Sequence, residues 1–399
     1  MSGQLESVKL TASFKIDGTL PSSLFNAYKQ ILVELLDYAH QRGITSFKRL
    51  KSERYYELRS KYPDLPSHYI YTACQMACSV YRSFRKLRRR GLARGDKPVF
   101  KKETIMLDDH LFNVDLNSWK ASIATENGRI EVRLLHGTYH EKFRGMKVRQ
   151  AWLVRRSDGY YLRVVFSKVV ELEKPNDKAI AVDINENNVT FGTEERVIQA
   201  KTKERCIRTA YFLKRKKLQT IPRLNERTLM AKYKGRESRR IAEIHHRIAN
   251  EIVKSAVEQG CSTVVLENLK GIRKKRVGKE MNGRLNRWSF RKLQTIIEYK
   301  AKLAGLNVVH VEARGTSSLC PRCRVGLSPS GYRLMRCPRC GLEEDRDKIA
   351  VLNLLQRYRI DVPASSVHGE GLPMTTERDE KYEGGRMKSV AKVNAQTER

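Results

Sequence analysis

Two short cysteine motifs near the carboxyl end constrain this chain more than any other feature. Each motif reads Cys-Pro-Arg-Cys, the first at Cys320 and Cys323 and the second at Cys337 and Cys340, with thirteen residues between them. Cysteine pairs at this spacing bring four thiolates into the tetrahedral arrangement that Zn²⁺ prefers. Because four protein ligands leave no coordination position for a substrate, we expect a structural zinc ribbon and not a catalytic zinc.

Three carboxylates outside this ribbon predict a second metal site. Asp183 and Glu267 each stand in or at the end of an apolar, strand-like segment, whereas Asp347 follows the ribbon and begins a helical pattern. A buried carboxylate is costly unless it is paired or binds a metal. Three of them converging from two strands and a helix would form a hard oxygen site for Mg²⁺ or Mn²⁺, and such ions can hydrolyse phosphodiesters.

The charge balance indicates a polyanionic partner. The 399 residues include 79 Lys and Arg against 44 Asp and Glu, a net charge of +35, and nucleic acid is the commonest partner of so basic a protein. With 40% hydrophobic residues the chain can bury more than one core, which argues against a simple basic tail protein. No apolar run of about 18 residues and no secretory signal pattern is present, so we expect no transmembrane helix, reduced thiols and a cytoplasmic location.

Hydrophobic periodicity predicts the order of the structural regions. Residues 7–16 alternate like a strand, residues 18–95 have helical spacing, and residues 98–170 alternate again with glycine-containing turns. We therefore expect a β-rich domain, interpreted as a barrel, with a helical module inserted after its first strand. The next part alternates apolar strands with helices, including one long basic helical stretch over roughly residues 203–259, as in an α/β domain.

Three basic runs are candidate nucleic-acid contacts, although a solvated helix face explains the first two equally well. They are Arg85, Lys86, Arg88, Arg89 and Arg90; Lys214, Arg215, Lys216 and Lys217; and Arg273, Lys274, Lys275 and Arg276. Tyr69, Tyr71 and Tyr81 could stack on bases, but core packing is the favoured interpretation. For Cys74 and Cys78, four residues apart on a predicted helix, we expect buried packing and not metal binding.

These motifs together resemble the TnpB family of transposon-encoded, RNA-guided nucleases, which is related to type V CRISPR effectors. The matching segments are Ile180–Ile184 around Asp183 (first RuvC motif), Val265–Leu269 around Glu267 (second), Arg287–Leu293 with Tyr299–Ala301 (the helix after it), Gly315–Cys323 (start of the zinc ribbon) and Asp345–Asp347 with Ala350 and Asn353 (third). The resemblance spans about residues 178–357. One departure is Ile349, which stands where the family usually has Asn.

The resemblance implies a multidomain fold of α/β and β parts: an RNase H-like RuvC nuclease domain with an inserted zinc ribbon, and an N-terminal wedge β-barrel with an inserted helical recognition module. The implied ranges are 1–17 and 96–175 for the wedge barrel, 18–95 for the recognition module, 176–313 and 342–360 for the nuclease domain, 314–341 for the ribbon, which would bind target nucleic acid, and 361–399 for a disordered tail.

The resemblance also implies an activity, namely RNA-guided cleavage of both strands of DNA. The catalytic residues would be Asp183, Glu267 and Asp347, which would hold Mg²⁺ or Mn²⁺. The second metal, zinc, would be held by the four cysteines of the ribbon. The partners would be a guide RNA from the transposon end and double-stranded target DNA next to a short adjacent motif. The protein would act as a monomer in the ribonucleoprotein, associated with the nucleoid of a prokaryote.

Three other interpretations remain open at this point. A compact type V CRISPR effector would differ by a neighbouring repeat–spacer array, which a protein sequence does not reveal. A guided or RNA-binding regulator that does not cut is a second alternative, against which the retained Asp183, Glu267 and Asp347 argue. A transposase could use an acidic triad for strand transfer, but the ribbon before Asp347 favours the nuclease lineage.

Overall fold

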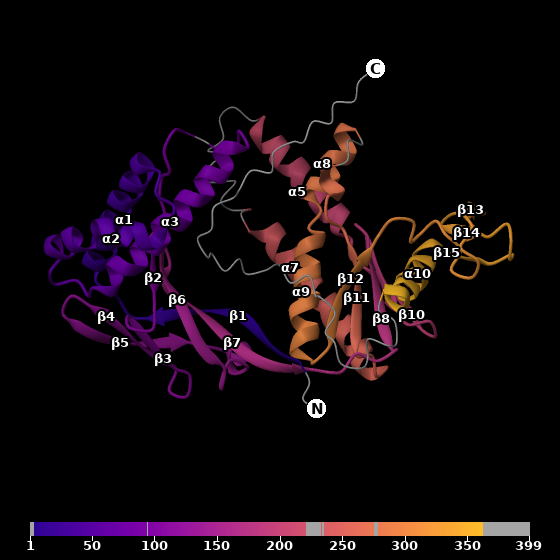
Figure 1. The fold of residues 1–399 in the computed structure, drawn as a ribbon, viewed down its shortest axis with the longest axis horizontal. Helices are drawn as coiled ribbons and strands as arrows, with labels where there is room; N and C mark the ends of the chain where they lie inside the picture. The colour runs from indigo at the N-terminus through magenta and orange to yellow at the C-terminus, as the bar shows by residue number, and fades with distance from the viewer. Residues whose placement is uncertain (1–3, 94, 221–232, 234, 275–277, 362–399) are drawn as a thin grey trace, which may run out of the picture. The chain divides into compact units, whose positions relative to one another are not determined.

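The chain divides into two compact units, each described here by itself. A computed structural model describes residues 4–93, 95–220, 233, 235–274 and 278–361 (Figure 1). One unit comprises Leu5–Glu171, and the other comprises Leu172–Arg399 with Met1–Gln4. Residues 362–399 of the expected tail, and Lys275 and Arg276 of the third basic run, lie outside the described residues.

The first unit contains a seven-stranded sheet in the order β2-β6-β7-β1-β5-β4-β3. Its strands are β1 (Gln4–Asp17), β2 (Thr104–Leu107), β3 (Phe112–Asp115), β4 (Lys120–Thr125), β5 (Gly128–Leu135), β6 (Lys147–Arg156) and β7 (Gly159–Leu172). The expected barrel is nearly closed: β2 and β3 are the two edges, and only residues 108–111 separate them in the chain. In β1, alternate side chains such as Phe14 and Ile16 are buried, as period-2 patterning requires.

Three helices are inserted between β1 and β2, as the periodicity predicted, and the short helix α4 (Thr138–Glu141) follows β5. The inserted helices are α1 (Ser22–Arg42), α2 (Phe47–Lys61) and α3 (His68–Arg89). The buried Tyr69 of α3 packs edge-on against Tyr28 of α1, and its hydroxyl donates to the carbonyl of Ala124 in β4 at 2.6 Å. That bond ties the helices to the sheet. Cys74 and Cys78 are fully buried, which confirms their packing role.

The second unit is built around a five-stranded mixed sheet in the order β10-β9-β8-β11-β12. Its strands are β8 (Ala179–Ile184), β9 (Asn188–Gly192), β10 (Val197–Lys201), β11 (Thr263–Asn268) and β12 (Asn307–Glu312). β8, β11 and β12 run parallel, whereas β9 and β10 run antiparallel to their neighbours. Residue periodicity does not predict β9 and β10, because both are short and carry polar residues among the apolar ones.

Helices cover both faces of this sheet: α7 (Arg236–Glu258) and α9 (Phe290–Leu303) pack on one face, and α10 (Arg346–Asp361) packs on the other. Helix α5 (Glu204–Gln219) packs against α7, and α8 (Lys279–Arg287) lies beside a short 3₁₀ turn, η1 (Ile272–Lys274). The single helix expected over residues 203–259 is wrong: α5 ends at Gln219, and Gly235 adopts a left-handed φ of 80° directly before α7. Among the described helices, none combines the length and the apolar character needed to cross a bilayer.

Strand β8 is buried on both faces, and its alternation assigns each side chain to one of them. Ile180, Val182 and Ile184 belong to the apolar cluster that α7 and α9 complete. Ala179 and Ala181 instead belong to the cluster formed with Val351, Leu354 and Leu355 of α10. Figure 1 shows the sheet between α9 on one side and α10 on the other. Side chains at odd-numbered positions of β8 therefore face α10.

The cysteine motifs lie in two turns, one before and one within a small three-stranded antiparallel sheet between β12 and α10. Its strands are β13 (Ser328–Pro329), β14 (Leu334–Arg336) and β15 (Glu343–Asp345). The buried side-chain amide of Asn353 in α10 donates to the carbonyl oxygens of Thr316 and Leu319, both at 2.7 Å. These bonds attach the start of the ribbon to the helix that follows it.

Candidate active site and cysteine cluster

Asp183 and Glu267 lie side by side at the ends of two parallel strands. The ladder between β8 and β11 includes the pair Val182 and Leu266, so Asp183 and Glu267 are the next residues on strands about 4.8 Å apart. Ala181 and Val265, two residues earlier, both face α10, and the period of a strand places the two carboxylates on the same face. Their exposed fractions are only 7% and 6%.

Asp347 reaches the same face from the first turn of α10. Its exposed fraction is 5%, and its Oδ2 accepts hydrogen bonds from Asn188 Nδ2 at 2.5 Å and from Gln199 Nε2 at 3.1 Å. These donors come from β9 and β10, the two strands that the sequence analysis missed. A polar amide within an otherwise buried strand such as β9 is the signal that could have identified Asn188.

The three carboxylates share a face of the sheet but do not form a closed cluster. Within the described ranges, groups of three or more ligand atoms all within 4.8 Å of one another comprise the four cysteines and the trio His68, Asp108 and His110. Asp183, Glu267 and Asp347 are not such a group. Asp347 is paired instead with a cation that the ribbon supplies.

That cation is Arg333, which no sequence motif indicates. Its guanidinium forms an ion pair with Asp347 Oδ2, and its Nε lies 3.5 Å from Asp345 Oδ2. Arg333 has a left-handed φ of 65°, which is uncommon for a residue other than glycine. The ribbon therefore presents a positive charge to one member of the carboxylate trio in this conformation.

Burial makes ionisation of the other two carboxylates unfavourable. Burial raises the pKa of Asp183 above its ordinary value, and the neighbouring Glu267 raises it further, although an amide hydrogen bond from Asn185 at 2.7 Å acts in the opposite sense. Burial likewise raises the pKa of Glu267, against a hydrogen bond from the Thr316 hydroxyl at 3.2 Å. Neither makes an ion pair with any described residue, so the pair suits a divalent cation with oxygen ligands.

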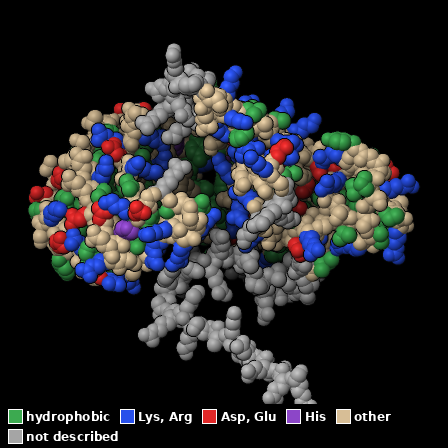
Figure 2. Space-filling model, turned by 90° about the horizontal axis from the view of Figure 1, so that it is seen from above, with side chains coloured by type: hydrophobic (Ala, Val, Ile, Leu, Met, Phe, Trp, Pro, Cys, Tyr) green, Lys and Arg blue, Asp and Glu red, His purple; other side chains and the backbone are tan. Residues whose placement is uncertain are grey.

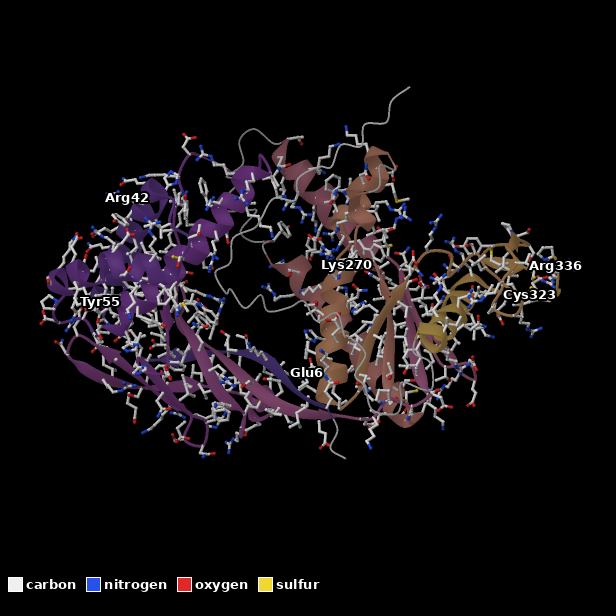
Figure 3. All side chains as sticks on the ribbon, viewed as in Figure 1. Glu6, Arg42, Tyr55, Lys270, Cys323 and Arg336 are labelled. Carbon is white, nitrogen blue, oxygen red and sulfur yellow. The ribbon has the colours of Figure 1, made fainter. Side chains whose placement is uncertain are left out.

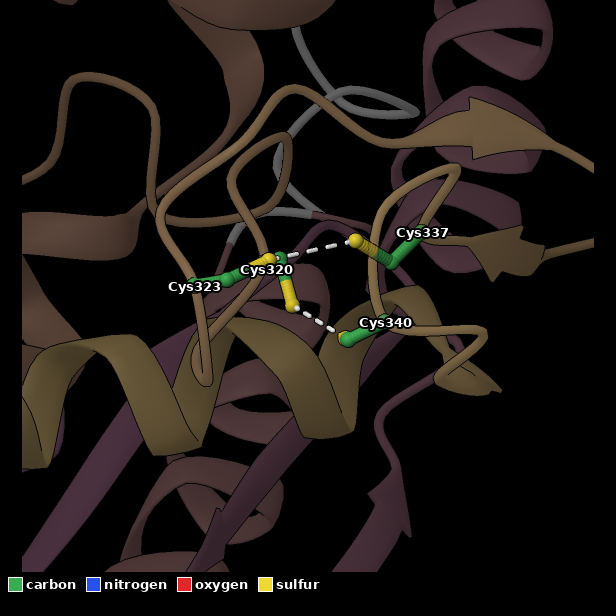
Figure 4. Close-up of side chains that lie close together, drawn as sticks. All are labelled: Cys320, Cys323, Cys337 and Cys340. Atoms are coloured by element: carbon green, nitrogen blue, oxygen red, sulfur yellow. Dashed lines mark hydrogen bonds between the residues drawn. The ribbon is translucent and has the colours of Figure 1, made fainter.

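The four cysteines of the ribbon come together as the spacing predicted. The Sγ atoms of Cys320 and Cys340 lie 3.6 Å apart and those of Cys323 and Cys337 lie 3.4 Å apart (Figure 4). A tetrahedral zinc with bonds of about 2.3 Å separates its sulfur ligands by roughly 3.8 Å, so the cluster has the size of a zinc site. A backbone N–H of Cys340 lowers the pKa of the Cys337 thiol, which favours the thiolate that a metal requires.

The basic runs differ in how far their side chains are engaged within the protein. Figure 2 shows Lys and Arg side chains spread over the face in view. In the first run, which comprises the last residues of α3 and Arg90 directly after it, no side chain makes an ion pair within the described part of the chain; these residues are Arg85, Lys86, Arg88, Arg89 and Arg90. Lys214, Lys216 and Lys217 project from α5, where Lys214 Nζ lies 5.1 Å from the centre of the Tyr233 ring.

Two arginines of these runs have partners within the protein. Arg215 pairs with Glu237 of α7 at 2.5 Å. Arg273 donates from Nε to the carbonyl of Leu285 at 3.0 Å and from a terminal nitrogen to the carbonyl of Trp288 at 2.5 Å. A guanidinium that satisfies carbonyls or a carboxylate has fewer donors left for phosphates, so these two arginines could offer phosphates only their remaining N–H groups; their contact with nucleic acid stays a prediction.

Comparison with known proteins identifies the family. The TnpB-like protein MJ0751 of Methanocaldococcus jannaschii is 37% identical over 206 residues, which cover 49% of this chain and 73% of that relative. The uncharacterized protein MJ0857 of the same organism is 30% identical over 203 residues, 44% of this chain and 72% of the relative. The chain therefore belongs to the TnpB-like proteins, as the motifs indicated.

Family profiles and solved structures agree with this assignment. The profile described as Cas12f1-like, TNB domain matches residues 290–354, and that of the uncharacterized protein MJ0013 family matches residues 24–123. A Cas12f1–sgRNA–target DNA complex has a chain with TM-score 0.53 at 14% identity, covering 88% of this chain and 99% of that chain. The mini-RNA-guided endonuclease CRISPR-Cas_phi3 has TM-score 0.50 at 11% identity, covering 89% and 92%. At these identities the similarity concerns the fold.

Replacing one ribbon cysteine should remove the metal. We expect Cys337→Ser to lower bound zinc well below one ion per chain and to lower the melting temperature, because three remaining ligands hold zinc poorly. Elemental analysis by mass spectrometry and thermal unfolding measure both. Cys206→Ser, which changes an exposed cysteine outside the ribbon, is the control and should behave like the wild type. Unchanged zinc in Cys337→Ser would refute the ribbon assignment.

The buried carboxylates should make the protein without divalent ions less stable as pH rises. The folded-state pKa of Asp183 lies above its unfolded value, so its contribution to stability is complete below about pH 4 and is lost as pH rises through the folded pKa. Between pH 5 and 8.5, the free energy of unfolding of the wild type should fall relative to Asp183→Asn by at least about 1 kcal/mol. Urea unfolding in buffer without Mg²⁺ measures this difference.

A matched variant separates this effect from general charge repulsion. Asp177→Asn removes an exposed carboxylate of the same unit, and its pH dependence should follow that of the wild type. If Asp183→Asn and Asp177→Asn show the same pH dependence, the buried carboxylate is not the cause.

Removing the ribbon cation should free Asp347 for a metal. We expect Arg333→Ala to increase the affinity of the nucleic-acid-free protein for Mn²⁺ several-fold, because a competing positive charge has left the carboxylate. Isothermal titration calorimetry measures the affinity directly. The control is Arg336→Ala, an exposed ribbon residue of equal charge that is labelled in Figure 3. Equal affinities in the two variants would show that Arg333 does not compete with the metal.

Proposed function

We propose that this protein is an RNA-guided, metal-dependent DNA endonuclease of the RuvC type, encoded by a transposon. The observation that carries the proposal is the burial of Asp183 and Glu267 side by side on one face of a sheet, with Asp347 brought to that face by α10. Two adjacent buried carboxylates without a counter-charge destabilise a fold, and a site for divalent cations is the simplest reason to keep them.

In this proposal each residue of the site has a defined task. Asp183, Glu267 and Asp347 would hold the ions, which when bound would activate water and stabilise the leaving oxygen. Asn185 and Thr316 would orient the first two carboxylates through the hydrogen bonds described above. Burial on the α10 face excludes bulk water, which strengthens every charge interaction at the site.

The partners follow from charge and from the family. A net charge of +35 supports binding to a guide RNA and to the heteroduplex that it forms with target DNA. Two relatives of this chain are named CRISPR-associated endodeoxyribonuclease Cas12f1, one of them from Syntrophomonas palmitatica, which is 38% identical over 100 residues and matches 25% of this chain. We infer that the guide derives from the transposon end and that the target lies next to a short adjacent motif.

The proposal includes the domain roles. The barrel (1–17 and 96–175) and the helical module (18–95) would hold the guide and read the adjacent motif, and the ribbon (314–341) would contact target nucleic acid beside the nuclease domain (176–313 and 342–360). The cysteine cluster, with the size of a zinc site, would stabilise the ribbon.

One observation favours a second candidate, a guided regulator that binds without cutting. Arg333 neutralises Asp347 in the conformation described, so the trio has one carboxylate already paired. A protein that kept this pair on binding its target would not cleave. The cleavage experiment below distinguishes the two functions.

The direct test is cleavage by the reconstituted ribonucleoprotein. The protein is expressed with the DNA that flanks its gene, the co-purifying RNA is sequenced, and plasmids that contain a guide-matched target next to randomised sequence are added with Mg²⁺. We expect double-strand breaks from the wild type, and at least about a 100-fold loss of cleavage from Asp183→Ala, since removing one metal ligand removes most of the metal's contribution.

Two controls make this test interpretable. RNA binding by Asp183→Ala should equal that of the wild type, and Asp177→Ala should cut normally. Retained cleavage by Asp183→Ala would overturn the metal-site assignment, whereas tight guided binding without any cleavage by the wild type would favour the regulator.

A further inference from the structure

A cavity of about 320 Å³ lies between the last turns of α1 and α3 in the first unit. It is lined by His40, Tyr81, Phe84, Arg85, Arg88 and Arg89. Its volume is at the lower end of the roughly 300–1,000 Å³ typical of ligand sites. The lining combines aromatic rings with guanidinium groups, so a ligand that uses the whole cavity needs both a flat ring and a negatively charged group.

The aromatic part of the cavity is rigid. The ring of His40 stands nearly perpendicular to those of Tyr81 and Phe84, at angles of 74° and 89° with centroids 5.9 and 5.8 Å away. Tyr81 and Phe84 have exposed fractions of 6% and 9%, so both belong to the core and reach the cavity with little freedom to move. A rigid aromatic wall accepts a flat ring by stacking or edge contact, without loss of side-chain entropy.

One buried polar atom in this wall has no partner. His40 Nδ1 makes no hydrogen bond to any described residue. A buried polar atom without a partner costs free energy, which a hydrogen bond with a ligand would relieve. As an acceptor, Nδ1 would match the exocyclic amines and ring N–H groups of nucleobases, and in the other tautomer it would donate to their ring nitrogens or carbonyl oxygens.

The charged part of the cavity is unneutralised. Arg85, Arg88 and Arg89 make no ion pair within the described residues, although elsewhere in the module Arg54 pairs with Glu34 and Glu57. Arg85 is half-buried, with its guanidinium 5.9 Å from the centre of the Tyr81 ring, whereas the other two are exposed. A guanidinium matches phosphate with two parallel hydrogen bonds, so the rim of the cavity favours phosphate oxygens.

We propose that this cavity binds one unpaired nucleotide, with its base against His40, Tyr81 and Phe84 and its flanking phosphates on Arg88 and Arg89. A duplex does not fit this chemistry, because its bases are stacked on each other and their faces are covered. A free phosphate would leave the aromatic wall unused. The nucleotide can come from the guide RNA or from a single strand of DNA, which share the chemistry.

This inference rests on the proposed function only in taking nucleic acid as the ligand, and it does not require cleavage. The experiment therefore uses the full-length Asp183→Asn protein, for which the proposed function predicts loss of cleavage without loss of nucleic-acid binding. Fluorescence anisotropy measures its affinity for dye-labelled hexamers of single-stranded RNA and DNA, and for the same hexamers with abasic sugars in place of the nucleotides.

Two double variants of equal charge separate the cavity from the basic surface around it. One changes Arg88 and Arg89 to Ala, and the other changes Lys86 and Arg90 to Ala, which belong to the same run but do not line the cavity. We expect the first pair to weaken hexamer binding by roughly tenfold or more beyond the second, because only the first pair would hold the flanking phosphates through charge-assisted hydrogen bonds. In His40→Ala, the ratio of the affinity for the normal hexamer to the affinity for the abasic hexamer should be smaller than in the parent protein.

The outcomes have distinct meanings. A specific effect of the cavity pair on RNA alone assigns the nucleotide to the guide, and an effect on DNA alone assigns it to a target strand. Equal weakening by the two double variants, together with an abasic hexamer that binds as well as the normal one, overturns the cavity while leaving the proposed function intact. Absence of any nucleic-acid binding by the parent protein overturns both.

Discussion

The main physical constraint on the second unit is that two carboxyl groups are buried next to each other. Asp183 and Glu267 occupy neighbouring positions on parallel strands, each with less than a tenth of its surface exposed. Like charges at such a separation repel, and burial removes the water that would screen them. The sheet tolerates this because the rest of both strands is apolar and packed on two faces, so that the remaining core outweighs the local cost. The same cost is what a bound cation would relieve.

Helix α10 connects this site to the ribbon. Its apolar side chains Val351 and Leu354 fill the face of the sheet that carries the carboxylates, its first turn provides Asp347, and Asn353 bonds the chain that enters the ribbon. The buried Ile349 belongs to this helix as well, and it offers packing where the family usually has an amide. A movement of the ribbon would therefore act on Asp347 directly, because Arg333 in the ribbon and Asp347 in the helix form an ion pair.

The first unit is organised around a curved sheet whose edges are protected and to which three helices are attached. Its sheet curves until the two edge strands are separated by only four residues of chain, which protects edges that would otherwise pair with other strands. The inserted helices attach to it through buried tyrosines such as Tyr69, and their acidic residues are largely used in ion pairs with neighbouring cations such as Arg54. The arginines at the end of α3 make no ion pair within the described residues, so they can bind a ligand. The cavity that they line is the place where such a ligand would bind.

The sequence by itself determined the ribbon, the three carboxylates and the alternation of strand and helix regions, because each of these is encoded in local spacing. Cysteines three residues apart, a carboxylate in an apolar run and apolar residues at period 2 or 3.6 are visible without tertiary structure. Only the tertiary structure decided which side chains meet across long separations. Asp347 accepts hydrogen bonds from Asn188 and Gln199, which lie on strands too short to recognise from the sequence. It also forms an ion pair with Arg333 of the ribbon. Arg273 belongs to a basic run in the sequence, but in the structure it donates hydrogen bonds to backbone carbonyls. Such contacts depend on the register of strands and the placement of a helix on a sheet, which local residue patterns do not specify.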